Sequence, residues 1–484
     1  MPNPLTRKKS LASLLSQAGD GHQSLKRTLN ARHLVALGIG AIIGADLFVR
    51  TAAASAEAAG PAVTLSFVVA AIGCLFAGLC YAEFAAMIPI AGSAYTYAYA
   101  TMGELVAWTI GWALVLEYAL GAATVSIAWS EYLNNLLGGA IPFQWCHSPL
   151  EVSAAGVHGV FNAPALLILF LLTALLIRGT QESATVNSII VFVKVSIVLI
   201  FIAIGWKFVN AGNHTPYLIP EGIVGHEGIF RHGWGGVLGG AGIVFFAFIG
   251  FDAVSTAAQE AKNPERDMPV GILGSLAVCT VLYVLFAHVL TGVANWQEFA
   301  VAGKEASVAY AIQKYMLGYG WLATLVMVAI LAGFSSVILV MLLGQSRVFF
   351  SMANDGLLPK IFAELHPRYR TPHKSNWLLL AFVGAFAAFI PGSMAGDLTS
   401  IGTLFAFVLV SGGIWVMRRS DPAAVRPFRA PLVPLVPILG ILVCSGMIIA
   451  LDHVTQITAF GWMLIGFVVY FGYSRKHSKL EGAA

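Results

Sequence analysis

The chain has 484 residues, of which 58% are hydrophobic and only 10% are charged, and its formal net charge is +4. A typical soluble domain carries about 25% charged residues, so these side chains cannot cover a water-facing surface and a soluble fold is excluded. Runs of roughly 20 apolar residues, the length of a membrane-crossing helix, recur along the whole chain. They predict an all-α integral membrane protein with 12 transmembrane helices, starting near residues 34, 61, 104, 162, 184, 237, 270, 320, 376, 397, 431 and 455.

Lysine and arginine set the expected orientation, because cytoplasmic loops retain positive charge. With a cytoplasmic N-terminus, 21 of the 27 basic residues fall on the cytoplasmic side. This asymmetry favours an even number of spans, with both termini in the cytoplasm and a location in the cell inner (plasma) membrane. The positive charge is therefore a topology signal, and no nucleic-acid partner is expected.

The spans predict one membrane domain over residues 31–474, with no second soluble domain. Residues 1–30 are polar and basic, and we expect them to form a cytoplasmic tail that is mobile or lies along the membrane surface. This tail has no apolar core of the kind that a signal peptide needs. Residues 475–484 are expected to form a second, short cytoplasmic tail.

Two of the predicted spans carry the same interruption. The first reads IIGADLF over residues 42–48, and the sixth reads FIGFDAV over residues 248–254. Because the two copies lie five spans apart, the second is inverted relative to the first. Paired, glycine-interrupted spans indicate a transporter with inverted repeats and a midplane binding site, since unwound backbone is tolerated only beside protein or a water-filled cavity. For Gly38 and Gly40, close helix packing is an equally good explanation.

Several stretches resemble the amino acid–polyamine–organocation superfamily, and specifically its branch of bacterial proteins similar to cationic amino acid transporters. They are LGIGAIIG (37–44), YAEFAAMIPIAGSAYTYAY (81–99), GWALVLEY (111–118), FFAFIGFDAVSTAAQEAKNPERDMPVGI (245–272), GQSRVFFSMANDGLLP (344–359) and SRKHSKL (474–480). The resemblance covers nearly the whole chain. It implies the leucine-transporter-like fold, with inverted five-helix repeats at about 34–208 and 237–417 and two further helices at about 431–474. Such proteins move amino acids or related amines, usually coupled to protons or to exchange.

The resemblance also implies how the two breaks would bind substrate. Free amides in the first break should hold the substrate carboxylate, which agrees with the positive end of the helix dipole there. The residues concerned are Ile43, Gly44, Ala45 and Asp46. Freed carbonyls of the sixth span should take the substrate ammonium, and they belong to Phe246, Ala247 and Ile249. Phe246 is also expected to gate the pocket.

Lys194 lies in the apolar run IIVFVKVSIVLI. An ammonium at the bilayer centre costs about 2.5–3.5 kcal/mol on insertion scales, so a functional role is expected. The resemblance implies that Lys194 stands where related carriers hold a sodium ion. Desolvation favours the neutral amine, so the side chain could gain and lose a proton during transport, with Ser335 and Ser336 as neighbours. A purely structural tether is the alternative.

Four acidic residues in or near the spans need separate interpretations. Glu117 is expected either to face the substrate pocket or to be protonated and hydrogen-bonded between helices. Asp252 follows the second break and is expected to organise the helix end or the solvated cavity. Glu83 and Glu260 lie near cytoplasmic span ends, where we expect structural or gating contacts with basic residues.

Asp46 departs from the pattern of the resembled family, which has a small residue and then Gly after IIG. Two like charges about 4 Å apart repel by roughly 4 kcal/mol at an effective dielectric constant of 20, which would oppose a substrate carboxylate. Asp46 could point away or be protonated, the substrate could lack a carboxylate, or the substitution could be engineered or inactivating. The sequence leaves these three alternatives open.

We therefore expect a secondary active permease for amino acids, coupled to protons, with alternating access around the two broken spans. The alternatives are a carrier of decarboxylated amines or polyamines that uses Asp46 as the amine partner, and a non-transporting amino acid sensor. No enzyme activity, cofactor or metal site is expected, because the sequence has no catalytic cluster, Walker loop or metal-ligand motif. The expected partners are the small-molecule substrate, protons and the lipid bilayer.

Overall fold

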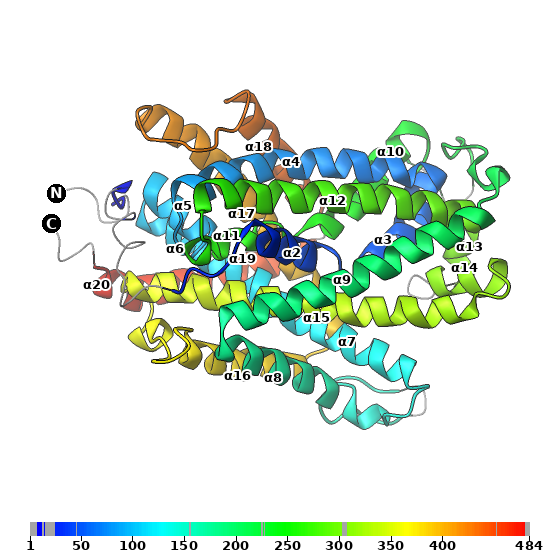
Figure 1. Ribbon diagram of the computed structural model, residues 1–484, viewed down its shortest axis with the longest axis horizontal. Helices are drawn as coiled ribbons and strands as arrows, with labels where there is room; N and C mark the ends of the chain where they lie inside the picture. The colour runs from blue at the N-terminus through cyan, green and yellow to red at the C-terminus, as the bar shows by residue number, and fades with distance from the viewer. Residues whose placement is uncertain are drawn as a thin grey trace.

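The computed structural model describes residues 7–11, 14, 25–44, 46–153, 156–223, 226, 228–302, 307–451 and 453–479. These residues form helices, loops and two isolated β-bridges, with no β-strand among them. The long helices lie along the long axis of the molecule (Figure 1). The described residues nearest the two ends of the chain meet at one end of this bundle, where Lys9 and Lys479 both contact Asp355.

The longer helices have these bounds, in chain order: α2 (Ala31–Ile42), α3 (Asp46–Ala54), α4 (Val63–Met87), α5 (Ala94–Thr101), α6 (Glu104–Val115), α7 (Gly121–Leu136), α8 (Ala163–Arg178), α9 (Thr180–Gly205), α10 (Gly233–Phe245), α12 (Pro264–Val293), α15 (Gly320–Asn354), α16 (His373–Phe389), α17 (Gly392–Ser420), α18 (Leu435–Ala450) and α19 (His453–Val469). Shorter helices are α11 (Ala253–Thr256), α13 (Trp296–Ala302), α14 (Ser307–Tyr315) and α20 (Arg475–His477).

The outside of the bundle is apolar, as lipid requires. Within the described ranges, eight helical stretches are long and apolar enough to cross a membrane, and three shorter apolar helices, α2, α8 and α18, accompany them. Large apolar side chains such as Phe192 (74% exposed) and Ile449 (77% exposed) face outward. The all-α membrane class predicted from composition is therefore confirmed. The count of twelve crossings and the inverted repeat stay predictions.

Helix boundaries follow the predicted spans with small shifts that have local causes. The helix expected near residue 270 is α12, and it begins at Pro264 because proline at the first helical position and acidic residues in the first turn favour a start there. A search for apolar runs places the start of this helix too late, because Glu265, Arg266 and Asp267 in its first turn are charged. α12 packs against both α2 and α4, so it stands beside the first break.

The N-terminal segment differs from its expected surface position. Lys9 is only 8% exposed, and Leu14 and Leu25 are 1% and 2% exposed. Leucine side chains in the polar tail find apolar partners in the bundle, which the overall polarity of the segment concealed. Thr28 and Leu29 donate backbone hydrogen bonds to the Glu260 carbonyl, so the segment just before α2 is tied to the chain just beyond α11.

Both predicted helix breaks are confirmed. α2 ends at Ile42, Ile43 has φ −79° and ψ 90°, and α3 begins at Asp46. α10 ends at Phe245, a 3₁₀ turn follows, and α11 begins only at Ala253. Ala45, which the resemblance places in the substrate site, lies outside the described residues.

The two breaks touch each other at Gly250. Its φ is +115°, a region that residues with a side chain rarely adopt. A Cβ atom at this position would lie 2.9 Å from the Ala41 Cβ and 3.1 Å from the Ala41 carbonyl oxygen. Glycine at 250 is therefore required both by its own backbone and by the close approach of α2.

Substitution of Gly250 tests this contact. We expect Gly250→Ala to lower the free energy of unfolding by about 1–3 kcal/mol, because alanine is strained at this φ and its methyl group meets α2. The measurement is the thermal unfolding midpoint of the purified protein in detergent. Gly242→Ala in α10 is the matched control, since a Cβ there meets nothing within 4 Å. An unchanged midpoint for Gly250→Ala would contradict the assignment.

Candidate functional site

Lys194 connects α9 to the first break. Its ammonium donates hydrogen bonds to the Gly40 carbonyl oxygen at 3.0 Å and to the Ile43 carbonyl oxygen at 2.6 Å. The residue is only 1% exposed. Because the helix ends at Ile42, these carbonyls need outside donors. The Lys194 side chain therefore reaches the first break, as the sequence predicts.

Tyr283 of α12 connects the two breaks directly. Its hydroxyl oxygen lies 2.9 Å from the Ile42 carbonyl oxygen and 2.9 Å from the Ala247 carbonyl oxygen. The residue is fully buried, and its ring packs against Phe248. One hydroxyl group thus lies within hydrogen-bond distance of a carbonyl oxygen from each interrupted helix.

A cavity of about 430 Å³ opens beside the breaks. Its lining includes Gly44, Asp46, Phe246 and Ile249 of the predicted substrate set. Ile43 is 1% exposed and Ala247 1% exposed, and both lie behind this lining. α3, which lines the cavity, extends toward the end of the bundle opposite the termini (Figure 1). The cavity is large enough for a small organic molecule.

Asp46 faces the cavity and has a cationic partner that sequence reasoning missed. The Arg50 Nε lies 3.3 Å from the Asp46 Oδ1, one helical turn along α3, and the two side chains are 42% and 46% exposed. The Arg50 guanidinium also lies over the Phe246 ring, 5.7 Å from its centroid. The spacing of four residues between an acid and a base on one helix was the available signal.

Glu117 and Asp252 lie outside the cavity lining. Glu117 is 1% exposed and belongs to the π-helical turn Leu116–Leu120, a distortion that often marks functional sites. Both of its carboxyl oxygens are buried without a hydrogen-bond partner among the described residues. Asp252 is fully buried, and its Oδ2 accepts a hydrogen bond of 2.7 Å from the Tyr118 hydroxyl.

Ser335 and Ser336 have different neighbours from those expected. The Ser335 hydroxyl accepts from the Trp129 indole at 3.0 Å and donates to the Leu331 carbonyl oxygen. The Ser336 hydroxyl donates to Asn187 at 2.7 Å. A Cβ on Gly40 would lie 2.5 Å from the Ser336 hydroxyl, so Ser336 packs tightly on α2 near the Lys194 contact. This close approach supports the packing role of Gly40.

Buried ion pairs tie helices together toward the end that carries the termini. Arg347 on α15 is fully buried and bonds Glu260 at 2.7 Å and the Thr180 hydroxyl at 2.9 Å. Glu83 of α4 pairs with Arg418 at 2.7 Å and Arg426 at 3.3 Å. The expected contacts of Glu83 and Glu260 with basic residues are confirmed. Arg347 is part of the core together with its buried partner Glu260.

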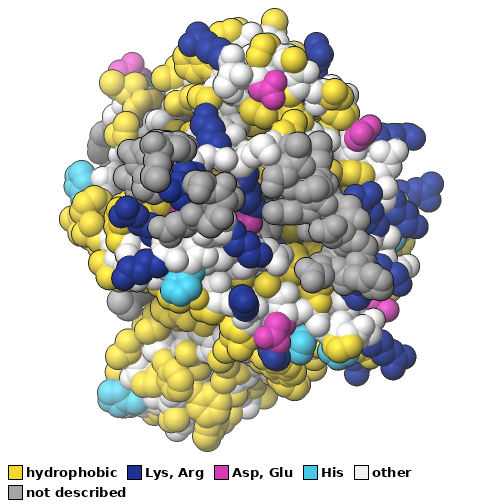
Figure 2. All heavy atoms as spheres, turned by 90° about the vertical axis from the view of Figure 1, so that its left-hand side faces the viewer, with side chains coloured by type: hydrophobic (Ala, Val, Ile, Leu, Met, Phe, Trp, Pro, Cys, Tyr) yellow, Lys and Arg dark blue, Asp and Glu magenta, His cyan; other side chains and the backbone are white. Residues whose placement is uncertain are grey.

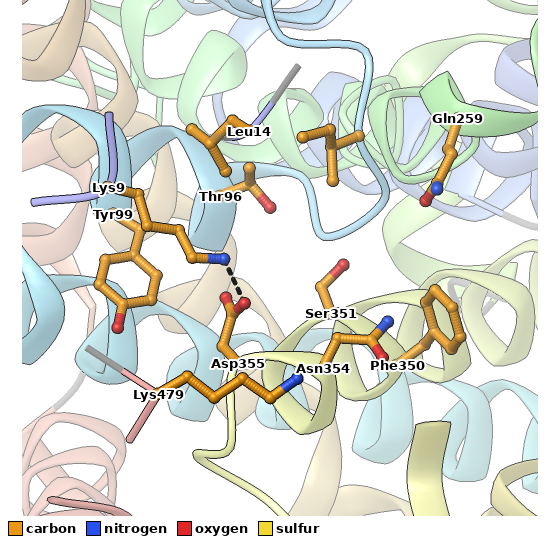
Figure 3. Close-up of a pocket in the computed structure, with 11 residues that line it drawn as sticks. Lys9, Leu14, Thr96, Tyr99, Gln259, Phe350, Ser351, Asn354, Asp355 and Lys479 are labelled. Carbon is orange, nitrogen blue, oxygen red and sulfur yellow. Dashed lines mark hydrogen bonds and ion pairs between the residues drawn. The ribbon is translucent and has the colours of Figure 1, made fainter. Parts of the chain in front are cut away.

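A second pocket, of about 250 Å³, lies at this same end and is shown in Figure 3. The Lys9 ammonium pairs with the Asp355 carboxylate, which also accepts 2.7 Å from the Tyr95 hydroxyl. The ammonium lies 5.3 Å from the Tyr99 ring centroid. The N-terminal segment is thereby bound to α5 and to the end of α15. The described residues Lys9 and Leu14 line this second pocket and are absent from the lining of the 430 Å³ cavity.

Comparison with known proteins decides the family. The sequence profile described as "Amino acid permease" matches residues 29–473, which is nearly the whole chain. The chain belongs to the amino acid permease family.

Relatives in this family match over long regions. The branched-chain amino acid permease BcaP of Bacillus subtilis is 44% identical over 99% of this chain and 100% of its own length. The methylthioribose transporter of Bacillus subtilis is 40% identical over 99% of both chains. Human cationic amino acid transporter 4 is 35% identical over 85% of this chain and 63% of its own length. These relatives are transport proteins rather than enzymes, and this permease is a multi-pass membrane transport protein.

The contact of Tyr283 with both breaks can be tested by a single substitution. We expect Tyr283→Phe to lower the free energy of unfolding by about 1–3 kcal/mol, because the hydroxyl donor shared by two buried carbonyls is lost. Substrate uptake should fall in parallel, since both breaks lose a fixed contact. The measurements are the thermal unfolding midpoint and uptake into proteoliposomes.

The matched control is Tyr319→Phe, at the start of α15, where the ring packs against Phe208 far from the breaks. Its unfolding midpoint should match that of the wild-type protein within measurement error. Equal midpoints for Tyr283→Phe and the wild-type protein would contradict the bridging role.

Proposed function

We propose that the protein is a secondary active transporter that carries amino acids across the cytoplasmic membrane, driven by protons. The observation that carries this proposal is the buried Lys194 ammonium on the Gly40 and Ile43 carbonyls. A group that binds the carbonyls of the broken helix more strongly when it is charged links protonation to the shape of the substrate site. The fold would be twelve spans, in two inverted five-helix repeats and two further helices.

Substrate binding would use both breaks. The substrate carboxylate would lie at the amides of Gly44 and its neighbours at the N-terminus of α3, where the helix dipole favours an anion. The ammonium would lie at the freed carbonyls of Phe246, Ala247 and Ile249. Phe246 lines the cavity beside Ile249, which supports its role as a gate.

Alternating access would proceed around this site. The 430 Å³ cavity reaches the breaks from one side, and the ion pairs of Glu260 with Arg347 and of Lys9 with Asp355 join helices at the other end. Figure 2 views the end that carries the termini, and Lys and Arg side chains gather across it with few Asp and Glu. This distribution supports a cytoplasmic location for both termini.

Lys194 would be the proton carrier, with Ser336 as a packing neighbour through Gly40. Glu117 and Asp252 would act from behind the cavity, Asp252 through Tyr118, and Ser335 would anchor α7 to α15 through Trp129. An amine carrier is the second candidate, since Asp46 places a carboxylate in the cavity. The relatives are named for branched-chain amino acids, methylthioribose and cationic amino acids, so the substrate must be argued from this cavity.

Lys194→Met tests the coupling. Uptake of labelled L-leucine into proteoliposomes should rise with an imposed inward proton gradient for the wild-type protein. We expect the variant to lose this rise, because methionine cannot carry the proton, and to retain exchange of internal for external substrate.

Lys207→Met is the matched control, because Lys207 is exposed beyond the end of α9. It should keep the wild-type response to the gradient. A Lys194→Met variant with undiminished gradient dependence would refute proton coupling at this residue.

A further inference from the structure

The α3 helix places an acid and a base together on the cavity wall. Asp46 is in the first turn of α3, where the substrate carboxylate is expected, and Arg50 follows one turn later. Both side chains are partly exposed and both line the cavity. Glu57 lines the cavity further along the same stretch of chain, in the π-helical turn Ser55–Ala59, and it has an interaction of its own.

The negative charge of Asp46 beside the first break is therefore balanced by Arg50. A lone Asp46 would repel a carboxylate and attract a cation, whereas the pair carries no net charge. Arg50 bonds Asp46 through Nε, so the two terminal amino groups of its guanidinium are left to donate to a ligand. A guanidinium binds carboxylates through two parallel hydrogen bonds.

The position of Arg50 is fixed by a second contact. Its guanidinium lies over the Phe246 ring at 5.7 Å, a distance at which a cation is attracted to the face of an aromatic ring. Phe246 lies on the other interrupted helix, so Arg50 spans the gap between the two breaks. A substrate beside Gly44 would lie in the same cavity as this guanidinium.

The rest of the cavity wall is mainly apolar. It includes Val125, Ile249, Phe334, Val337 and Met341. An extended cationic side chain would find few carboxylates in this wall, whereas an aliphatic side chain would bury apolar surface.

We infer that Arg50 is a specificity-determining residue, which offsets Asp46 and makes the cavity select zwitterionic amino acids with apolar side chains. This inference rests on the proposed function and names the substrate class of the same site. Arg50 would offset the repulsion between Asp46 and the substrate carboxylate at Gly44. Removing the charge of Arg50 alone should change the class of ligand that the cavity prefers. Removing the charges of both Asp46 and Arg50 should restore the wild-type preference.

A charge-swap series tests the inference with two probes, L-leucine and its decarboxylated counterpart 3-methylbutan-1-amine. Affinities are measured on the purified full chain by competition binding, and the result is the ratio of the two affinities. We expect Arg50→Gln to shift this ratio toward the amine by about tenfold or more, because the charge of Asp46 is then no longer offset by its partner one turn along α3. The double variant Asp46→Asn with Arg50→Gln should return to within about threefold of the wild-type ratio, since coupled sites are not additive.

The ratio does not depend on the fraction of folded protein, because both probes are measured on one preparation. Arg231→Gln is the control, on an exposed loop residue outside the cavity lining, and it should keep the wild-type ratio. An unchanged ratio in Arg50→Gln, or a double variant that stays amine-selective, would overturn the inference while leaving amino acid binding intact. A wild-type protein that binds neither probe would instead overturn the proposed function.

Discussion

The freed backbone carbonyls of the two interrupted helices are the constraint on which the rest of this structure depends. A carbonyl inside a membrane has no water to bind, so each one must find a donor in the protein. Here the Lys194 ammonium donates to Gly40 and Ile43, and the Tyr283 hydroxyl, with one proton, lies between the Ile42 and Ala247 carbonyls, of which Ile42 also accepts from the Gly44 amide. These two side chains join the two breaks to α9 and α12.

The surroundings of the breaks follow from this requirement. Gly250 must be glycine because α2 comes within contact of its backbone, and Gly40 must be small because Ser336 and Asn187 pack against it. α12 crosses both breaks and places Tyr283 between them. The outer faces of the helices, including those of α9 and α12, present apolar side chains outward, and ion pairs such as that of Glu260 with Arg347 join segments near the end that carries the termini.

Much of this could be predicted from sequence because the signals are local. Glycine followed two residues later by aspartate is costly in an apolar span, and so is Lys194, so each points to function without any knowledge of its neighbours. Tyr283 carries no such signal, because a tyrosine in an apolar helix is ordinary and its partner Ile42 is 241 residues away. Arg50 carries no such signal either, because its role depends on its contacts with both Asp46 and Phe246. The burial of Lys9 could not be predicted from the local sequence either, because its partner Asp355 lies 346 residues away.

In the proposed transport mechanism, the substrate site and the proton-carrying Lys194 both contact the first break. A bound amino acid carboxylate near Gly44 would lie beside the Lys194 ammonium and favour its charged form, so substrate binding should take up protons. Isothermal titration of L-leucine at one pH, in two buffers with different ionisation enthalpies, measures this directly. The account predicts that the observed binding enthalpy differs between the buffers in the direction of net proton uptake. Equal enthalpies in the two buffers would contradict it.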